Sequence, residues 1–352
     1  MTSGHRRPLT DVVAAIERSF RPVPVVELDL PGVRLFAQLA FANPVSSIKD
    51  APAFWILKRA IERGSVDEST TLIESSSGNF AYALSVYARQ LGLRFVPVID
   101  PNISPLNEAL LRATCGRTVK ITRRDPTGGF LLTRLDAVRQ LQAELDNAFW
   151  TNQYGNIDNL EGHYAITARS LCEALPRLDY AFIGVSSAGT LAGVSRRLKE
   201  RFPGVRIIAV DVVGSIIFGG PPRKRYIPGI GASIQPDLLR EARVDDVIVV
   251  GELESALACY ELSRRHGLFL GGSSGSVYAA IQRHLPTMTA AAEPYVAFLG
   301  CDRGNAYLDT IYDPAWVDWL AQQEAEAAPD ELGPSPPVNA LNRGHGVSGV
   351  RP

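Results

Sequence analysis

The sequence predicts an α/β protein whose sheets are mainly parallel. Short runs of β-branched and apolar residues recur along the chain, and amphipathic stretches of helical length separate them, with short loops at the junctions. Strands that alternate with helices in this way are typical of parallel sheets, because each helix carries the chain back to the edge where the next strand begins. The runs that we expect to be strands are 35–38, 71–73, 95–99, 118–121, 180–184, 206–211, 246–250 and 295–299.

The stretches between these runs carry apolar residues at the spacing of one helical face. In open parallel sheets, ligands bind beyond the carboxyl ends of the strands, next to helix N-termini. Loops at those places are therefore the candidates for a functional site. The stretches that we expect to be helices are 53–63, 80–91, 106–113, 131–144, 163–175, 191–201 and 252–266.

Composition argues against several classes of protein. The 352 residues suffice for one large or two medium domains, and a formal net charge of −1 gives no electrostatic basis for binding nucleic acid. No stretch reaches the roughly 18 apolar residues of a membrane span, and the N-terminus lacks the apolar core of an export signal. The 4 cysteines lie far apart without a CxxC pair, and no HExxH occurs. We therefore expect a cytoplasmic protein without a metal site or a disulfide framework.

Two segments depart from the alternating pattern. Residues 218–236 are rich in glycine, proline and basic residues, which favours a long ordered loop or a mobile lid, and loops of such length are often functional. From residue 321 the composition shifts to Ala, Glu, Pro, Gly and Asn, which predicts a disordered tail over 321–352.

A lysine on a short loop is the first candidate for chemistry. Lys49 lies just before the expected helix 53–63. A lysine amine that leaves water can lose its proton and attack a carbonyl, which is how pyridoxal phosphate (PLP) is held as a Schiff base. A lysine before a helix is ordinarily a surface residue, so Lys49 alone does not establish a site.

A polar turn at residues 74–79 supplies the second candidate. It places three serines, a glycine and an asparagine between an expected strand and an expected helix. Such a turn at a helix N-terminus presents free backbone N–H groups and suits an anion. A cofactor anchor and a carboxylate-binding turn together define a possible amino-acid site.

Three further loops carry polar or small residues. Residues 182–193 contain small side chains that let backbone N–H groups approach a phosphate, although the Gly-Lys-Ser/Thr of a Walker A loop is missing. Residues 268–276 form a second small-residue turn between a strand and a helix, for which an N-cap serine is the alternative interpretation. Residues 151–156 combine amides and a phenol that could bind a polar substrate, with an ordinary turn as the alternative.

With these loops in this order, residues 20–320 resemble the fold-type II PLP enzymes of the cysteine synthase family. Ser47-Ile48-Lys49-Asp50 is similar to the family's Schiff-base motif, and Pro228-Gly229-Ile230-Gly231-Ala232 is similar to its mobile active-site loop. The resemblance implies two open, twisted, mainly parallel sheets in two domains with the cofactor between them, and a homodimer. Residues 1–47 with 156–320 would form the large PLP-binding domain, and residues 48–155 the smaller domain that closes on the substrate.

The resemblance also implies roles for individual residues. Lys49 would hold the cofactor and act as the catalytic base. The residues that would bind the cofactor are Lys49, Asn79, Ser186, Ser187, Ala188, Gly189, Thr190 and Ser273, the last of which would face the pyridine nitrogen. The residues that would bind substrate are Ser76, Ser77, Gly78, Asn79, Arg134, Gln153, Tyr154, Ser187 and Gly231. Among these, Arg134, Tyr154 and Ser187 match the positions that recognise O-phospho-L-serine in one branch of the family.

That branch consists of the N-(2-amino-2-carboxyethyl)-L-glutamate synthases of siderophore pathways. The chain departs from ordinary cysteine synthases at Ala51, at Phe80 and in residues 21–24, and its phosphate-binding turn is poorer in glycine. Resemblance to the branch implies β-replacement on O-phospho-L-serine through an aminoacrylate, with the amine of L-glutamate as nucleophile. The product leads to 2,3-diaminopropionate. The alternatives are a cysteine synthase that uses O-acetyl- or O-phosphoserine and sulfide, a serine or threonine dehydratase, and a catalytically silent partner protein of the same fold.

Charge bears on the choice of substrates. A phosphate dianion needs a cation or several donors, and Arg134 and the basic run 223–225 are the candidates. A solvated surface loop is the alternative interpretation of that run. Glutamate as second substrate would also need a cation for its side-chain carboxylate, which the sequence does not identify.

Overall fold

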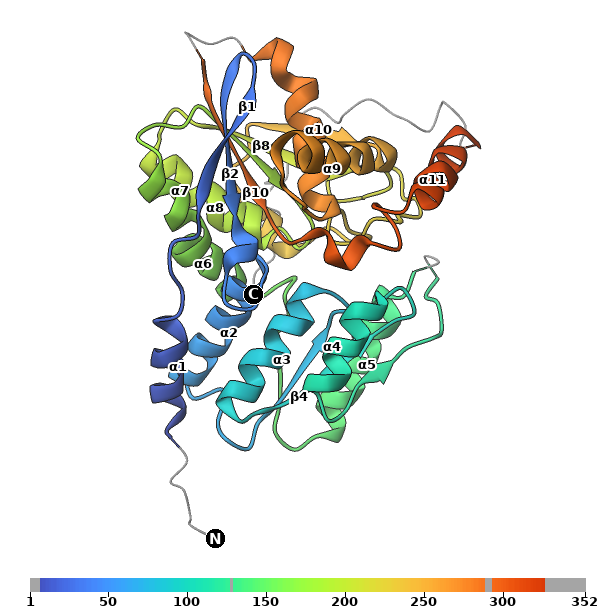
Figure 1. Ribbon diagram of the computed structural model, residues 1–352. Coiled ribbons are helices and arrows are strands. Elements are labelled where there is room, and N and C mark those ends of the chain that lie inside the picture. Colours follow the sequence, from blue (N-terminus) through green and yellow to red (C-terminus); the bar gives the residue numbers. More distant parts are fainter. Residues whose placement is uncertain (1–6, 127–128, 289–292, 327–352) are drawn as a thin grey trace, which may run out of the picture.

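The computed structural model describes residues 7–126, 129–288 and 293–326, and the chain forms two sheets covered by helices (Figure 1). The six-stranded sheet has the order β1-β2-β10-β7-β8-β9, and the four-stranded sheet has the order β5-β4-β3-β6. In the described part of the chain, the neighbouring strands are parallel except for β1 with β2. The expected α/β class with mainly parallel sheets is confirmed. The strands are β1 (Val25–Leu30), β2 (Val33–Leu39), β3 (Thr71–Ser75), β4 (Arg94–Ile99), β5 (Val119–Lys120), β6 (Ala148–Trp150), β7 (Tyr180–Gly184), β8 (Arg206–Val212), β9 (Asp246–Val250) and β10 (Tyr295–Gly300).

Helices connect the strands, as the sequence predicts. Each expected helix is present, although the expected helix 163–175 begins as a π-helix, η2 (His163–Thr167). The α-helices are α1 (Leu9–Glu17), α2 (Asp50–Glu62), α3 (Asn79–Leu91), α4 (Pro105–Thr114), α5 (Leu131–Glu144), α6 (Ile157–Gly162), α7 (Ala168–Ala174), α8 (Gly189–Arg201), α9 (Glu252–His266), α10 (Gly272–His284) and α11 (Pro314–Glu326). The described residues also contain the 3-10 segments η1 (Ala40–Ala42), η3 (Asp237–Glu241), η4 (Leu285–Thr287) and η5 (Gly304–Tyr307).

All eight predicted runs are strands; the structure adds β1 and the short β6, and it lacks the strand expected before α10. β1 was not expected, because the charged Glu27 and Asp29 interrupt its apolar residues, which suits an antiparallel edge strand with one side in solvent. The run before α10 is not a strand, since Leu270 makes only an isolated bridge with Arg303. The turn into α10 therefore follows a loop.

The six-stranded sheet is buried on both faces. Along β7, Ala181 and Ile183 pack with α7 and α8, whereas Tyr180 and Phe182 face the opposite side and pack with α9 and α10. This alternation follows from the two-residue period of a strand. Helices on both faces leave the carboxyl ends of the strands as the accessible edge, which positions the site.

The four-stranded sheet has its own core, and the N-terminal helix belongs to it. Leu9 and Val13 of α1 pack in one apolar cluster with Phe54 of α2 and Tyr87 of α3, and Figure 1 shows α1 beside α2. The division expected from the family resemblance places residues 1–47 with the larger sheet, but the first helix packs against the helices of the smaller one.

Two features concern the ends and the long loop. Residues 213–236 contain no helix or strand and form the long connection that the composition predicts. α11 continues to Glu326, although a disordered tail is expected from residue 321, and residues 327–352 lie outside the described residues. Within the described ranges, none of the helices has both the length and the apolar composition needed to cross a bilayer.

Candidate active site

The loops that the sequence singles out meet beyond the carboxyl ends of the strands. Ile48, next to the candidate lysine, donates its N–H to the carbonyl of Cys301 at 2.8 Å, so the lysine loop docks on the turn after β10. Asn79, the first residue of α3, donates from Nδ2 to Asp302 Oδ2 at 2.7 Å. Segments of both sheets are thereby joined in one site.

Asp50, the residue after Lys49, holds the lysine loop in place. Asp50 accepts hydrogen bonds from Val45 N and from Ser47 Oγ, which fixes the loop at the start of α2. Burial lowers the pKa of the Lys49 amine, and the nearby Cys301 and Asp302 groups act in the opposite direction. The lowered pKa favours the neutral amine, which is the nucleophilic form.

The turn between β7 and α8 has the shape of an anion cradle. Ala188 has a φ of +62°, a left-handed conformation that glycine adopts most readily, so the turn keeps this shape although it is poor in glycine. Within the described ranges, no group accepts a hydrogen bond from the N–H of Ser187, Ala188, Gly189 or Thr190. Unpaired N–H donors at the start of a long helix suit a phosphate.

Two buried residues that the sequence analysis did not select support this turn. Asn159 of α6 donates from Nδ2 to the carbonyl of Gln153 at 2.6 Å, and a Cβ added to Gly189 would lie 2.2 Å from Asn159 Oδ1. His163 Nε2 lies 3.1 Å from Thr190 Oγ1. Burial and, to a smaller extent, the charge of the nearby lysine lower the pKa of His163 well below 6.5, so the ring is neutral at pH 7.

The polar loop before α3 lies next to the predicted glutamine. Gln153 donates from its backbone N–H to Glu74 Oε2 at 3.2 Å and from Nε2 to the Ser75 carbonyl at 3.3 Å. Ser76 Oγ accepts from Gly78 N at 3.5 Å, which shapes the loop itself. The structure thus brings the predicted carboxylate-binding residues of this loop and Gln153 together.

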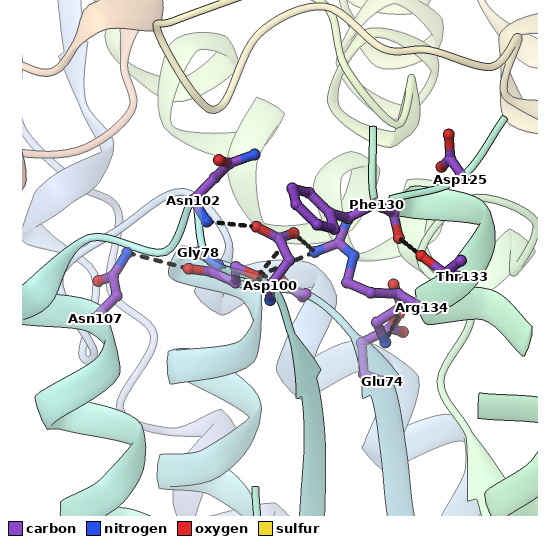
Figure 2. A network of polar contacts seen from close by, with 12 residues as sticks. Glu74, Gly78, Asp100, Asn102, Asn107, Asp125, Phe130, Thr133 and Arg134 are labelled. Carbon is purple, nitrogen blue, oxygen red and sulfur yellow. Dashed lines mark hydrogen bonds and ion pairs between the residues drawn. The ribbon is translucent and has the colours of Figure 1, made fainter. Parts of the chain in front are cut away.

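Arg134 reaches the same loop from α5, as Figure 2 shows. Its Nη1 lies 3.0 Å from Asp100 Oδ2 and donates to Ser77 Oγ at 3.1 Å. The arginine side chain is only 13% exposed, and among the described residues its Nε has no hydrogen-bond partner. Arg134 is therefore near the predicted substrate loop, but Asp100 already compensates its charge.

The other predicted residues lie around this space. Gly231 accepts a hydrogen bond from Ser186 Oγ at 3.1 Å, which docks the long loop on the β7–α8 turn, where Ser187 is buried. Ser273 is buried near the start of α10. Burial raises the pKa of Tyr154, and two arginines, Arg134 and Arg225, act in the opposite direction.

Asp302 is the main site residue that sequence reasoning missed. Its Oδ2 accepts hydrogen bonds from Asn79 Nδ2 at 2.7 Å and from Tyr307 OH at 2.9 Å. Its Oδ1 is buried and has no partner within the described part of the chain. A Cβ added to Gly271 would lie 2.1 Å from that oxygen, so the turn before α10 approaches Asp302 as only glycine permits. Asp302 thus connects three site segments.

Comparison with known proteins assigns the family. Residues 16–299 match the model of the pyridoxal-phosphate dependent enzymes. The chain belongs to this family. Its cofactor is therefore PLP, and the fold-type II architecture expected from the sequence is confirmed.

Individual relatives of this PLP enzyme are more specific. The chain is 44% identical over 308 residues to the N-(2-amino-2-carboxyethyl)-L-glutamate synthase of Ralstonia nicotianae and 42% identical over 309 residues to that of Cupriavidus metallidurans. Each match covers 87% of this chain and 90% of the relative. Among solved structures, O-acetylserine dependent cystathionine β-synthase from Helicobacter pylori is similar, with a TM-score of 0.78 and 26% identity, covering 85% of this chain and 98% of that chain.

The residues present fit the chemical groups of PLP. The unpaired N–H groups at 187–190 suit its phosphate, and the desolvated amine of Lys49 suits its carbonyl carbon. Bound PLP supplies an electron sink for breaking a bond to the α-carbon of an amino acid. The roles of Lys49 in carrying the cofactor and of Ser273 at the ring nitrogen stay predictions.

Replacing Asp302 by Asn should shift the pH dependence of PLP uptake. The negative charge of Asp302 raises the pKa of Lys49, whereas an amide keeps the shape and an oxygen that can accept from Asn79. Without that charge, the pKa of Lys49 falls, and the reactive neutral amine is present at lower pH. We expect the acidic limb of the uptake rate, followed by the visible absorption of PLP added to cofactor-free protein, to move to lower pH.

The matched control for this variant is Asp309→Asn, which removes an exposed carboxylate from the same region. Its uptake profile should coincide with that of the wild-type protein. An acidic limb that stays in place, or moves to higher pH, in Asp302→Asn would show that Asp302 does not set the protonation of Lys49.

Proposed function

We propose that the protein catalyses β-replacement on O-phospho-L-serine with L-glutamate as amine nucleophile, giving N-(2-amino-2-carboxyethyl)-L-glutamate and phosphate. The observation that carries this proposal is the 44% identity to a synthase of that name, over 87% of this chain. Two arginines near Tyr154 are compatible with the anionic substrates that the reaction needs.

In this proposal the residues of the site have separate roles in substrate binding and proton transfer. The loop of Ser76, Ser77, Gly78 and Asn79, with Gln153, would bind the α-carboxylate, because hydroxyl, amide and backbone donors satisfy a carboxylate. Lys49 would remove the α-proton as general base and return a proton to the product.

Phosphate departure requires its own donors. Arg134, Tyr154 and Ser187 would hold the phosphate of the substrate, and the loop around Gly231 would close over the site. Closure would exclude water between the two half-reactions, since hydrolysis would waste the substrate.

The test is a two-step experiment on purified, PLP-loaded enzyme. Adding O-phospho-L-serine should change the visible spectrum and release phosphate, and L-glutamate should then reverse the change and yield the adduct, detected by mass spectrometry. Reversal by sulfide but not by glutamate would identify a cysteine synthase. Spontaneous release of ammonia and a keto acid would identify a dehydratase. A response to O-acetyl-L-serine alone would remove the phosphate-binding roles of Arg134 and Tyr154.

We also propose a two-domain division in which the sheets move as separate bodies, residues 48–155 together with α1 closing on the remainder. The core of the four-stranded sheet supports this division, with α1 attached to the closing part.

We further propose that the protein is a homodimer in the cytoplasm. Its product would serve to make 2,3-diaminopropionate for a siderophore or another secondary metabolite. Light scattering of the purified protein tests the dimer.

A further inference from the structure

Arg225 lies in the long loop 213–236, and its hydrogen-bond partners are uncharged. Its Nη1 donates to the carbonyl of Gly214 at 2.6 Å, and its Nη2 donates to Ser233 Oγ at 3.0 Å, so both partners are neutral. In the described part of the chain, no carboxylate lies within ion-pair distance of Arg225. The side chain is half-buried, which makes an uncompensated charge costly.

Two acids act on Arg225 without forming an ion pair with it. Asp211 and Glu252 both act on it at longer range. Glu252 Oε1 accepts from the N–H groups of Tyr226 and Ile227 at 2.7 and 2.6 Å, and is committed to the backbone. Burial raises the pKa of Asp211 to about 6 and that of Glu252 to about 7, so Glu252 is partly protonated at neutral pH.

The backbone holds Arg225 in this place. Gly231 has a φ of +71°, and a Cβ added there would lie 3.1 Å from Arg225 Cδ. The neighbouring Lys224 differs, because it is exposed and stacks over the Tyr226 ring at 4.6 Å from the centroid. The contacts of the loop therefore hold the Arg225 side chain in place, whereas the Lys224 side chain is exposed to solvent.

Arg134 and Arg225 approach Tyr154 from different parts of the chain. Both oppose the rise of the Tyr154 pKa, so both lie within electrostatic range of its phenol. Arg134 belongs to α5 of the four-stranded part, beside the carboxylate loop, and Asp100 neutralises it. Arg225 belongs to the connection after β8 of the six-stranded sheet and donates to the neutral carbonyl of Gly214.

We propose that Arg225 binds the side-chain carboxylate of the second, dicarboxylic amine substrate. The inference rests on the proposed function. In the proposed function the first substrate would be anchored by its own carboxylate on the loop beside Arg134, with its phosphate within reach of that arginine. An amine that carries two carboxylates would then approach from the side of Arg225, where a carboxylate leaving water needs a cation.

The experiment compares Arg225→Gln and Arg225→Lys with the wild-type enzyme. In Arg225→Gln we expect the KM for L-glutamate to rise about ten- to hundredfold, the range for losing a charge-assisted hydrogen bond. The concentration of O-phospho-L-serine that half-saturates the spectral change should stay the same. Arg225→Lys should recover part of the loss, because it restores the charge without the planar fork.

Two controls separate recognition from folding. Lys224→Gln removes the same charge from the adjacent residue and should leave both constants unchanged. Wild-type enzyme should prefer L-glutamate to L-glutamine as nucleophile, and this preference should shrink in Arg225→Gln. A loop that is merely disordered would weaken both nucleophiles equally and would overturn the inference.

Other outcomes are equally decisive. An unchanged KM for glutamate in Arg225→Gln, or a loss confined to O-phospho-L-serine with O-acetyl-L-serine unaffected, would overturn the inference, the latter by assigning Arg225 to the phosphate. If wild-type enzyme gives the spectral change but no adduct with glutamate, the proposed function itself fails. That result is distinguishable because it appears before any variant is made.

Discussion

Replacing Lys49 by Ala is expected to abolish the visible absorption of lysine-bound PLP and to lower the rate of β-replacement by at least about a thousandfold. Burial lowers the pKa of this amine, so the neutral, nucleophilic form is favoured. Losing both the covalent anchor and the general base removes two contributions that act as a unit, and such losses are large. Absorption spectra after dialysis, with phosphate release as the activity assay, measure the effect.

The control is Lys120→Ala, which removes an exposed lysine paired with Glu108. An exposed ion pair contributes little, so spectrum and activity should match the wild type. If Lys49→Ala retained the lysine-bound absorption, another amine would carry the cofactor and the site assignment would fall.

The sequence predicts elements whose signal is local. Examples are the short, largely apolar runs of β3, β4, β7 and β8, which are buried on both faces. The local sequence pattern is enough to predict them as strands. β1 is different, because its charged Glu27 and Asp29 are exposed and its pairing with β2 is antiparallel. Its polar residues hide the strand from a search for apolar runs.

The residues of the site also differ in whether the local sequence indicates them. The predicted loops are visible because glycine, serine and asparagine between a strand and a helix have a local meaning. Asp302 has no local signal, since its partner Asn79 is 223 positions away. The pairing of Arg134 with Asp100 is also non-local, and it changes the charge available to a substrate. Burial and long-range pairing, which sequence patterns do not record, decide what these groups can do.

Replacing Gly193 by Ala should destabilise the protein more than the same substitution at a glycine with open space around it. A Cβ there would lie 2.1 Å from the carbonyl oxygen of Leu160 and 2.8 Å from Tyr164 N, both backbone atoms that cannot rotate away. Alanine normally stabilises a helix interior by about 1 kcal/mol relative to glycine, but overpacking costs about 1–3 kcal/mol or more. α8 must therefore move away from α6 and the π-helix η2. We expect the Tm to fall by about 5 °C or more.

The displacement should also weaken PLP binding, because the same helix begins at the anion cradle and Thr190 contacts His163. Equilibrium dialysis should show a lower affinity for PLP in Gly193→Ala, and thermal unfolding of the cofactor-free protein should show the loss of stability by itself. Gly204→Ala is the matched control, since nothing lies within 4 Å of a Cβ at that position and its φ is not positive. Equal Tm values for the two variants would mean that the close approach of α8 to α6 does not limit stability, and an unchanged affinity for PLP would mean that it does not hold the cradle in place.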